Sequence, residues 1–128
     1  MLAAVPADGM LGGRGYRAAP SSKELTVHEI DITHLHALLR QDPATPVVDV
    51  REDVEYADGH VPGAISVPLS ELVARHAEIG ALTGPVYLVC EVGGRSGQAA
   101  AWLEGQGYDV RNVAGGTRAW REAGLPVE

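Results

Sequence analysis

The stretch from residue 85 to residue 106, PVYLVCEVGGRSGQAAAWLEGQ, contains the only cysteine of the chain. Residues 85–89 form the most apolar run in the sequence and predict a buried strand. The two glycines after Cys90 predict a turn, and the alanine-rich residues 96–106 predict a helix that packs closely against a sheet. Cys90 is therefore expected where a buried strand passes through a loop into a helix.

The same alternation of short strands and helices continues from about residue 25 to the end of the chain. Further strands are predicted at residues 26–30, 47–50, 64–67 and 109–113. Further helices are predicted at residues 32–39, 53–58, 70–76 and 117–123, with Asp31 and Ser70 as helix caps. The connections are too long for hairpins, which predicts an α/β fold with a parallel sheet covered by helices on both faces. Ligands of such sheets bind at the carboxyl ends of the strands, where Cys90 lies.

Length, composition and charge restrict the class of protein. The 128 residues, 45% of them hydrophobic, suit one globular domain over residues 24–128. Residues 1–23, rich in glycine, alanine and proline, are expected to form a flexible extension. The net charge of -7 argues against a nucleic-acid partner, and no apolar run is long enough to span a membrane. A single cysteine, with no secretory signal pattern before it, predicts a cytoplasmic protein without internal disulfides.

The residues around Cys90 favour a negatively charged sulfur. Gly93 and Gly94 let successive backbone N–H groups point inward, and the following helix adds the positive end of its dipole. Arg95 adds a full positive charge, so the sequence predicts a lowered thiol pKa and a nucleophilic Cys90. The alternative is that a lone cysteine serves as a small buried apolar residue. The glycine pair and the strand–loop–helix context favour the reactive thiol.

Four segments in order resemble the single-domain rhodanese family. They are VVDVRE (residues 47–52), GHVPGAISVPL (59–69), VYLVCEVGGRS (86–96) and VAGGTRAW with GLPVE (113–128). The resemblance covers residues 24–128, and it implies a rhodanese-like, five-stranded parallel sheet with helices on both faces.

The resemblance also implies sulfane sulfur transfer with Cys90 as the catalytic nucleophile. The Cys90 thiolate would take sulfur from thiosulfate or from another persulfide, including a persulfide on a protein. It would then hold the sulfur as a persulfide and pass it to cyanide or a thiol. The substrate-binding groups would be the backbone N–H groups of Glu91, Val92, Gly93, Gly94, Arg95 and Ser96. No cofactor and no metal are implied.

The sequence argues against a phosphatase and a metal site and leaves one alternative to the enzyme. Phosphatases of similar fold have five residues between cysteine and arginine, whereas only four separate Cys90 from Arg95, and Glu91 would repel a phosphate. Glu91 would also repel thiosulfate to some extent. A sulfur-carrier or regulatory module that docks a protein partner is the main alternative. A metal site is not expected, because His28, His34, His36 and His76 lack ligand spacing.

Several residues outside the loop receive structural predictions. Asp49 and Arg51 face the same side of one strand. A structural ion pair or hydrogen-bond network with Glu55 or neighbouring loops is expected for Arg51, although a substrate role stays open. His60 is expected to fix a turn, and Gly115-Gly116 to allow a close backbone approach to the cysteine loop. Trp120 is expected in the core, with contact to the substrate pocket left open.

Overall fold

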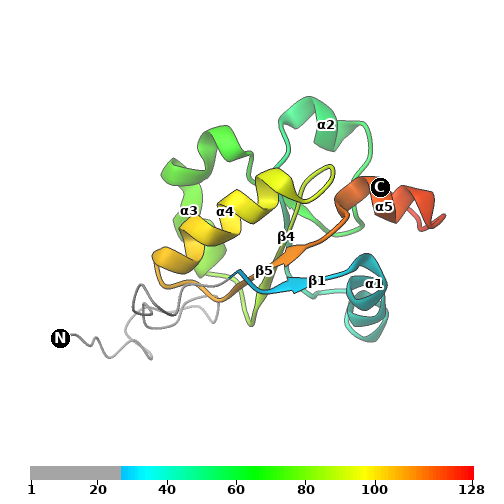
Figure 1. Ribbon diagram of the computed structural model, residues 1–128, viewed down its shortest axis with the longest axis horizontal. Helices are drawn as coiled ribbons and strands as arrows, with labels where there is room; N and C mark the ends of the chain where they lie inside the picture. The colour runs from blue at the N-terminus through cyan, green and yellow to red at the C-terminus, as the bar shows by residue number, and fades with distance from the viewer. Residues whose placement is uncertain (1–26) are drawn as a thin grey trace.

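The computed structural model describes residues 27–128 and shows a five-stranded parallel sheet (Figure 1). The strands are β1 (Glu29–Ile30), β2 (Val47–Asp49), β3 (Ile65–Ser66), β4 (Val86–Val89) and β5 (Val110–Val113). Their order across the sheet is β1-β5-β4-β2-β3, and each pairs in parallel with its neighbours. The predicted α/β fold is thereby confirmed. The predicted extension over residues 1–23 lies outside the described residues.

Helices cover both faces of the sheet, as expected. They are α1 (Ile32–Gln41), α2 (Asp53–Ala57), α3 (Leu72–Gly80), α4 (Gly94–Gly105) and α5 (Gly116–Glu122), with a 3-10 turn η2 (Leu69–Glu71) before α3. Buried side chains of α3 and α4 pack on one face of the sheet, and those of α1 and α5 pack on the other. Figure 1 shows α3 and α4 on its left side and α1 and α5 on its right.

The two central strands supply the core on both faces. In β4, Val86 and Leu88 face the α3–α4 side, whereas Val89 faces the α1–α5 side. All three of these valine and leucine side chains are fully buried, as expected for a strand that is covered by helices on both faces.

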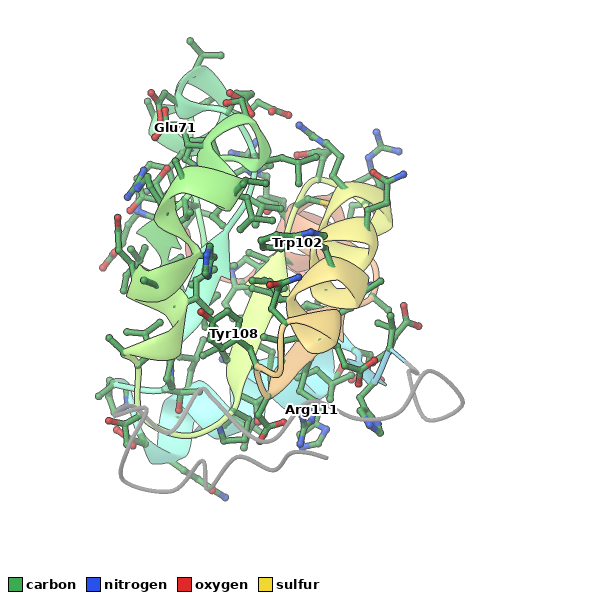
Figure 2. The ribbon with its side chains drawn as sticks, turned by 90° about the vertical axis from the view of Figure 1, so that its left-hand side faces the viewer. Glu71, Trp102, Tyr108 and Arg111 are labelled. Atoms are coloured by element: carbon green, nitrogen blue, oxygen red, sulfur yellow. The ribbon has the colours of Figure 1, made fainter. Side chains whose placement is uncertain are left out.

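An aromatic cluster lies between α3 and α4 (Figure 2). His76 Nδ1 lies 2.7 Å from the Tyr108 hydroxyl, and the His76 ring meets the Trp102 ring edge-on at 5.5 Å between centroids. Gly80 lies against the same tyrosine, because a Cβ at this position would come within 2.6 Å of the Tyr108 ring. These contacts hold α3 against α4.

One predicted helix cap is confirmed and the other is wrong. Asp31 precedes α1, and its carboxylate accepts a hydrogen bond from the His34 N–H at 2.9 Å. Ser70 lies inside η2 and does not cap a helix; its hydroxyl donates to Glu52 Oε1 at 2.7 Å. Helix α3 begins two residues later and continues to Gly80, beyond the predicted end near His76. A carboxylate from a distant segment thus takes the hydroxyl that was expected to cap the helix.

Helix α4 begins at Gly94, two residues before the predicted start. The residue before it, Gly93, has φ +108, a left-handed conformation that favours glycine. The chain can therefore turn sharply after Cys90 and enter the helix at once. Within residues 27–128, no helix is both long enough and apolar enough to cross a bilayer.

Candidate active site

Cys90 directly follows β4, at the carboxyl edge of the sheet. Its neighbour strands are β2 and β5, so the cysteine lies at the centre of this edge. The residue is 1% exposed, and the partly exposed segment of residues 91–96, which comprises a short loop and the first turn of α4, lies against it. The thiol is thus shielded from bulk water beneath a loop whose own backbone faces it.

Hydrogen bonds from this loop favour the negatively charged sulfur. The Gly93 N–H donates to Cys90 Sγ at 3.1 Å. Burial raises the pKa of the Cys90 thiol. The Ser96 hydroxyl, when it donates to the sulfur, and the backbone N–H groups of Ser96, Gly93 and Val92 together outweigh burial. The pKa therefore lies below its ordinary value, in the direction that the sequence predicts.

The hydroxyl of Ser96 lies between the cysteine and a buried asparagine. Ser96 Oγ is 3.3 Å from Cys90 Sγ and 2.6 Å from Asn112 Oδ1. Asn112 comes from β5, opposite Leu88 of β4, and it is 2% exposed. Its amide nitrogen donates to Gly93 O at 3.2 Å and to Glu29 Oε2 at 2.8 Å. Asn112 thus holds both the loop and its serine.

The charge of Arg95 is bound by Glu55 of α2. The guanidinium donates two hydrogen bonds to this carboxylate, at 2.7 and 2.8 Å. The pairing lowers the pKa of Glu55 to about 2, chiefly through the hydrogen bonds from Arg95. Arg95 still interacts electrostatically with Cys90, as expected, but its hydrogen bonds go to Glu55, so it also anchors α2 beside the loop.

Glu91 also directs its side chain to cations. Its carboxylate lies 3.4 Å from Arg51 Nη1 and 3.9 Å from Arg118 Nε. Arg51 is 2% exposed and forms an ion pair with Asp49 at 2.8 Å. It also donates to Gly59 O of a neighbouring loop at 2.8 Å, as predicted, whereas Glu55 binds Arg95 instead. The structural prediction for Arg51 is therefore confirmed.

The start of α5 fixes the first two residues of the loop. The Thr117 N–H donates to Cys90 O at 2.8 Å, and the Arg118 N–H donates to Glu91 O at 2.9 Å. A Cβ on Gly116 would come within 2.5 Å of Cys90 O. The predicted close approach of the Gly115-Gly116 segment to the cysteine loop is thus confirmed, and Gly116 is the glycine that makes it.

The remaining candidate residues lie away from the sulfur. The His60 ring stacks on Tyr56 at 3.7 Å, and the His60 backbone pairs with that of Glu128, which fits the predicted turn. Trp120 is buried on the α1–α5 face and donates from Nε1 to Pro126 O at 2.7 Å. Trp120 is thus a core residue, as predicted. Among residues 27–128, no three potential ligand side chains gather to hold a metal ion.

Reasoning from the sequence singled out the loop but missed the residues that hold it from outside. These are Glu55, whose partner was expected to be Arg51, together with Asn112, Thr117 and Arg118. One signal was present for Asn112, because a polar amide between the buried valines of a predicted strand needs a hydrogen-bond partner.

Comparisons with known proteins agree with this geometry. The family model described as "Rhodanese-like domain" matches residues 31–123. A protein named "Sulfurtransferase" from Allochromatium vinosum is 38% identical over 102 residues, which cover 79% of this chain and 94% of the relative. "Thiosulfate sulfurtransferase GlpE" from Pseudomonas putida is 40% identical over 91 residues, which cover 70% of this chain and 81% of the relative.

Among solved structures, a rhodanese-related protein from Thermoplasma volcanium superimposes with a TM-score of 0.71 at 31% identity. The superposition covers 79% of this chain and 97% of the other. The family match extends over β2 to β5 and includes Cys90 with its whole loop. The chain therefore belongs to the rhodanese-like family, whose members related to it include sulfurtransferases.

Proposed function

We propose that this chain transfers sulfane sulfur from thiosulfate or a persulfide donor to a thiol or cyanide, through a persulfide on Cys90. The observation that carries the proposal is a shielded thiol at the carboxyl edge of the sheet, faced by the backbone N–H groups of Val92, Gly93 and Ser96. The name of the Pseudomonas putida relative supports thiosulfate as one donor.

In the first half-reaction, the Cys90 thiolate attacks the outer sulfur of the donor. A bond forms between Cys90 Sγ and this sulfur, while the bond between the two donor sulfurs breaks. With thiosulfate, the leaving group is sulfite, which departs with the electron pair. The negative charge of the thiolate passes to the terminal sulfur of the persulfide, so charge is conserved.

In the second half-reaction, a nucleophilic acceptor attacks the terminal sulfur and restores the thiolate. The N–H groups of residues 91–96, of which those of Val92, Gly93 and Ser96 face the Cys90 sulfur, would stabilise the terminal sulfur until the acceptor arrives. The thiolate is a good leaving group, so the step needs little help from an acid or base. This two-step route predicts ping-pong kinetics. The route also requires a free thiol, and we propose the cytoplasm, where thiols are kept reduced, as its compartment.

Cys90→Ser tests the proposal directly. The serine hydroxyl is a far weaker nucleophile than a thiolate, so turnover of thiosulfate and cyanide should fall by about a thousandfold or more. Intact-mass spectrometry of the wild-type chain after thiosulfate treatment should show the added mass of one sulfur atom, and the Cys90→Ser chain should show none. Ser70→Ala, which removes an exposed hydroxyl elsewhere, serves as the control and should retain both activities.

Two results would contradict the enzyme proposal. Wild-type protein that gains no sulfur from thiosulfate or from a small persulfide would remove its basis. A persulfide that forms on Cys90 but leaves only to one protein partner, and never to a small acceptor, would instead support the sulfur-carrier module.

A further inference from the structure

The Ser96 hydroxyl has one proton and two acceptors within reach. Cys90 Sγ lies at 3.3 Å and Asn112 Oδ1 at 2.6 Å. The shorter contact falls at the lower end of hydrogen-bond lengths between oxygen atoms, so a proton must lie in it. An amide oxygen cannot supply that proton, and therefore Ser96 donates to Asn112.

The orientation of the Asn112 amide is fixed by its other partners. Glu29 Oε2 at 2.8 Å and Gly93 O at 3.2 Å can only accept hydrogen bonds, so both must face the amide nitrogen. The amide oxygen is thereby held toward Ser96. Because Asn112 is 2% exposed, water does not compete for this oxygen.

This arrangement suits a sulfur that carries no negative charge. While Ser96 donates to Asn112, its oxygen turns a lone pair toward Cys90 Sγ, where it can accept a hydrogen bond from the neutral thiol. When the thiol proton leaves to water, the Ser96 hydroxyl must rotate and donate to the thiolate. Asn112 Oδ1 then loses its donor while buried, which costs free energy.

We propose that Asn112 is a positioning residue, which holds the Ser96 proton away from Cys90 and so favours the forms in which Sγ is neutral over the bare thiolate. Those forms are the thiol and the persulfide, whose charge lies on the terminal sulfur. The backbone N–H groups of the loop favour negative sulfur, and Asn112 opposes them. The part that concerns the persulfide rests on the proposed function, whereas the part that concerns the thiol does not.

The first experiment measures the rate of Cys90 alkylation by iodoacetamide against pH. In Asn112→Ala the Ser96 hydroxyl is free to donate to the thiolate, so the midpoint should move to lower pH by about half to one pH unit. In the Ser96→Ala background, Asn112→Ala should leave the midpoint unchanged. Asn112→Leu keeps the bulk of the side chain and gives the same comparison if the alanine variant does not fold.

Charged groups around the loop stay the same in every variant. They are Glu29, Asp49, Arg51, Glu55, Glu91, Arg95 and Arg118. Thr45→Val is the control, because it removes a hydrogen bond to Asp42 O at 2.7 Å that lies outside the cysteine loop and its contacts. Its midpoint should equal that of the wild type. A midpoint in Asn112→Ala that is unchanged or raised, or an equal shift with and without Ser96, would overturn the inference.

A second experiment examines the persulfide. At a fixed ratio of thiosulfate to sulfite, the ratio of persulfide to free enzyme in Asn112→Ala should fall by about threefold or more, as read by intact mass. An unchanged ratio would overturn the persulfide part. If wild-type protein forms no persulfide, the proposed function fails together with this part, while the alkylation profiles still decide the role of Asn112 toward the thiol.

Discussion

Glu91, the residue directly after Cys90, is the carboxylate that an anionic donor of the proposed reaction would meet. Two cations flank it, Arg51 at 3.4 Å and Arg118 at 3.9 Å. Arg51 is buried and already forms an ion pair with Asp49. Arg118 is 61% exposed, and its 3.9 Å contact with Glu91 is a long ion pair. The local charge that a donor would encounter next to Cys90 therefore depends on the negative charge of Glu91 and the positive charge of Arg118.

Single substitutions of this pair should change which donor is preferred. Methanethiosulfonate carries one negative charge and thiosulfate carries two, although both present the same outer sulfur. Glu91→Gln should raise the ratio of kcat/KM for thiosulfate to that for methanethiosulfonate by roughly threefold or more, because a like charge is removed. Arg118→Gln should lower the ratio by a similar factor. Steady-state kinetics with both donors measure it.

Arg40→Gln is the control for net charge in this comparison. Arg40 is an exposed arginine near the end of α1, and it lies outside the cysteine loop. Its loss should leave the donor ratio at the wild-type value, and the double variant Glu91→Gln/Arg118→Gln should return close to that value. Equal ratios in Glu91→Gln, Arg118→Gln and Arg40→Gln would refute a role for the pair in donor choice.

At the scale of elements, the junction between the cysteine loop and α5 depends on one glycine. Gly116 has φ +61, and a Cβ there would lie 2.5 Å from Cys90 O and 2.6 Å from Glu91 O. Both neighbours are backbone atoms that are themselves hydrogen-bonded to Thr117 and Arg118. The contact leaves no room for a side chain, so the start of α5 and the loop must move apart if one is added.

Gly116→Ala should therefore destabilise the fold by about 2 kcal/mol or more, since it adds both a clash and an unfavourable backbone conformation. Urea denaturation gives the free energy of unfolding. Gly105→Ala provides the matched control: this glycine lies at the end of α4 with open space around its Cβ position. The control should change stability by less than about 1 kcal/mol, toward greater stability. Similar values for the two variants would show that the junction tolerates a side chain.

The elements themselves follow from local signals in the sequence, and this is why most of them were predicted. The Asp31 cap and the apolar run of β4 depend on residues within a few positions of each other. The cap at Ser70 failed because Glu52, eighteen positions earlier, accepts its hydroxyl. Such a contact exists only once the chain has folded, so no local pattern could reveal it.

The same distinction applies to the candidate site. The position of Cys90 and the glycine turn follow from one continuous segment, and the predicted direction of the Cys90 pKa agrees with the structure. The partner of Ser96 does not follow from that segment. It depends on the register between β4 and β5, which places Asn112 opposite Leu88. Likewise, the ion pair of Arg95 with Glu55 does not follow from that segment, because it forms only when α2 brings Glu55 to the loop.

At the scale of the whole molecule, three distant segments meet around the cysteine loop. Glu55 of α2 binds Arg95, Asn112 of β5 binds Ser96, and the first turn of α5 binds the carbonyls of Cys90 and Glu91. Figure 1 shows this loop between α2 and the start of α5, at one end of the sheet. Because the loop is held from three sides, the stability of the fold and the geometry of the site are coupled.

The pair of Glu55 and Arg95 makes part of this coupling sensitive to acid. The pKa of Glu55 is lowered from 4.5 to about 2 in the folded chain, so between these values the unfolded chain binds the proton more readily. The stabilisation is complete above about pH 4.5 and is lost as pH falls toward 2. Both side chains are about one-third exposed, which limits the effect to about 1 kcal/mol.

Urea denaturation from pH 5 to pH 2 should therefore show a shallower loss of stability in Glu55→Gln than in wild type. Glu122→Gln, an exposed carboxylate on α5, should keep the wild-type slope, and a slope unchanged in Glu55→Gln would mean that this pair does not link folding to pH.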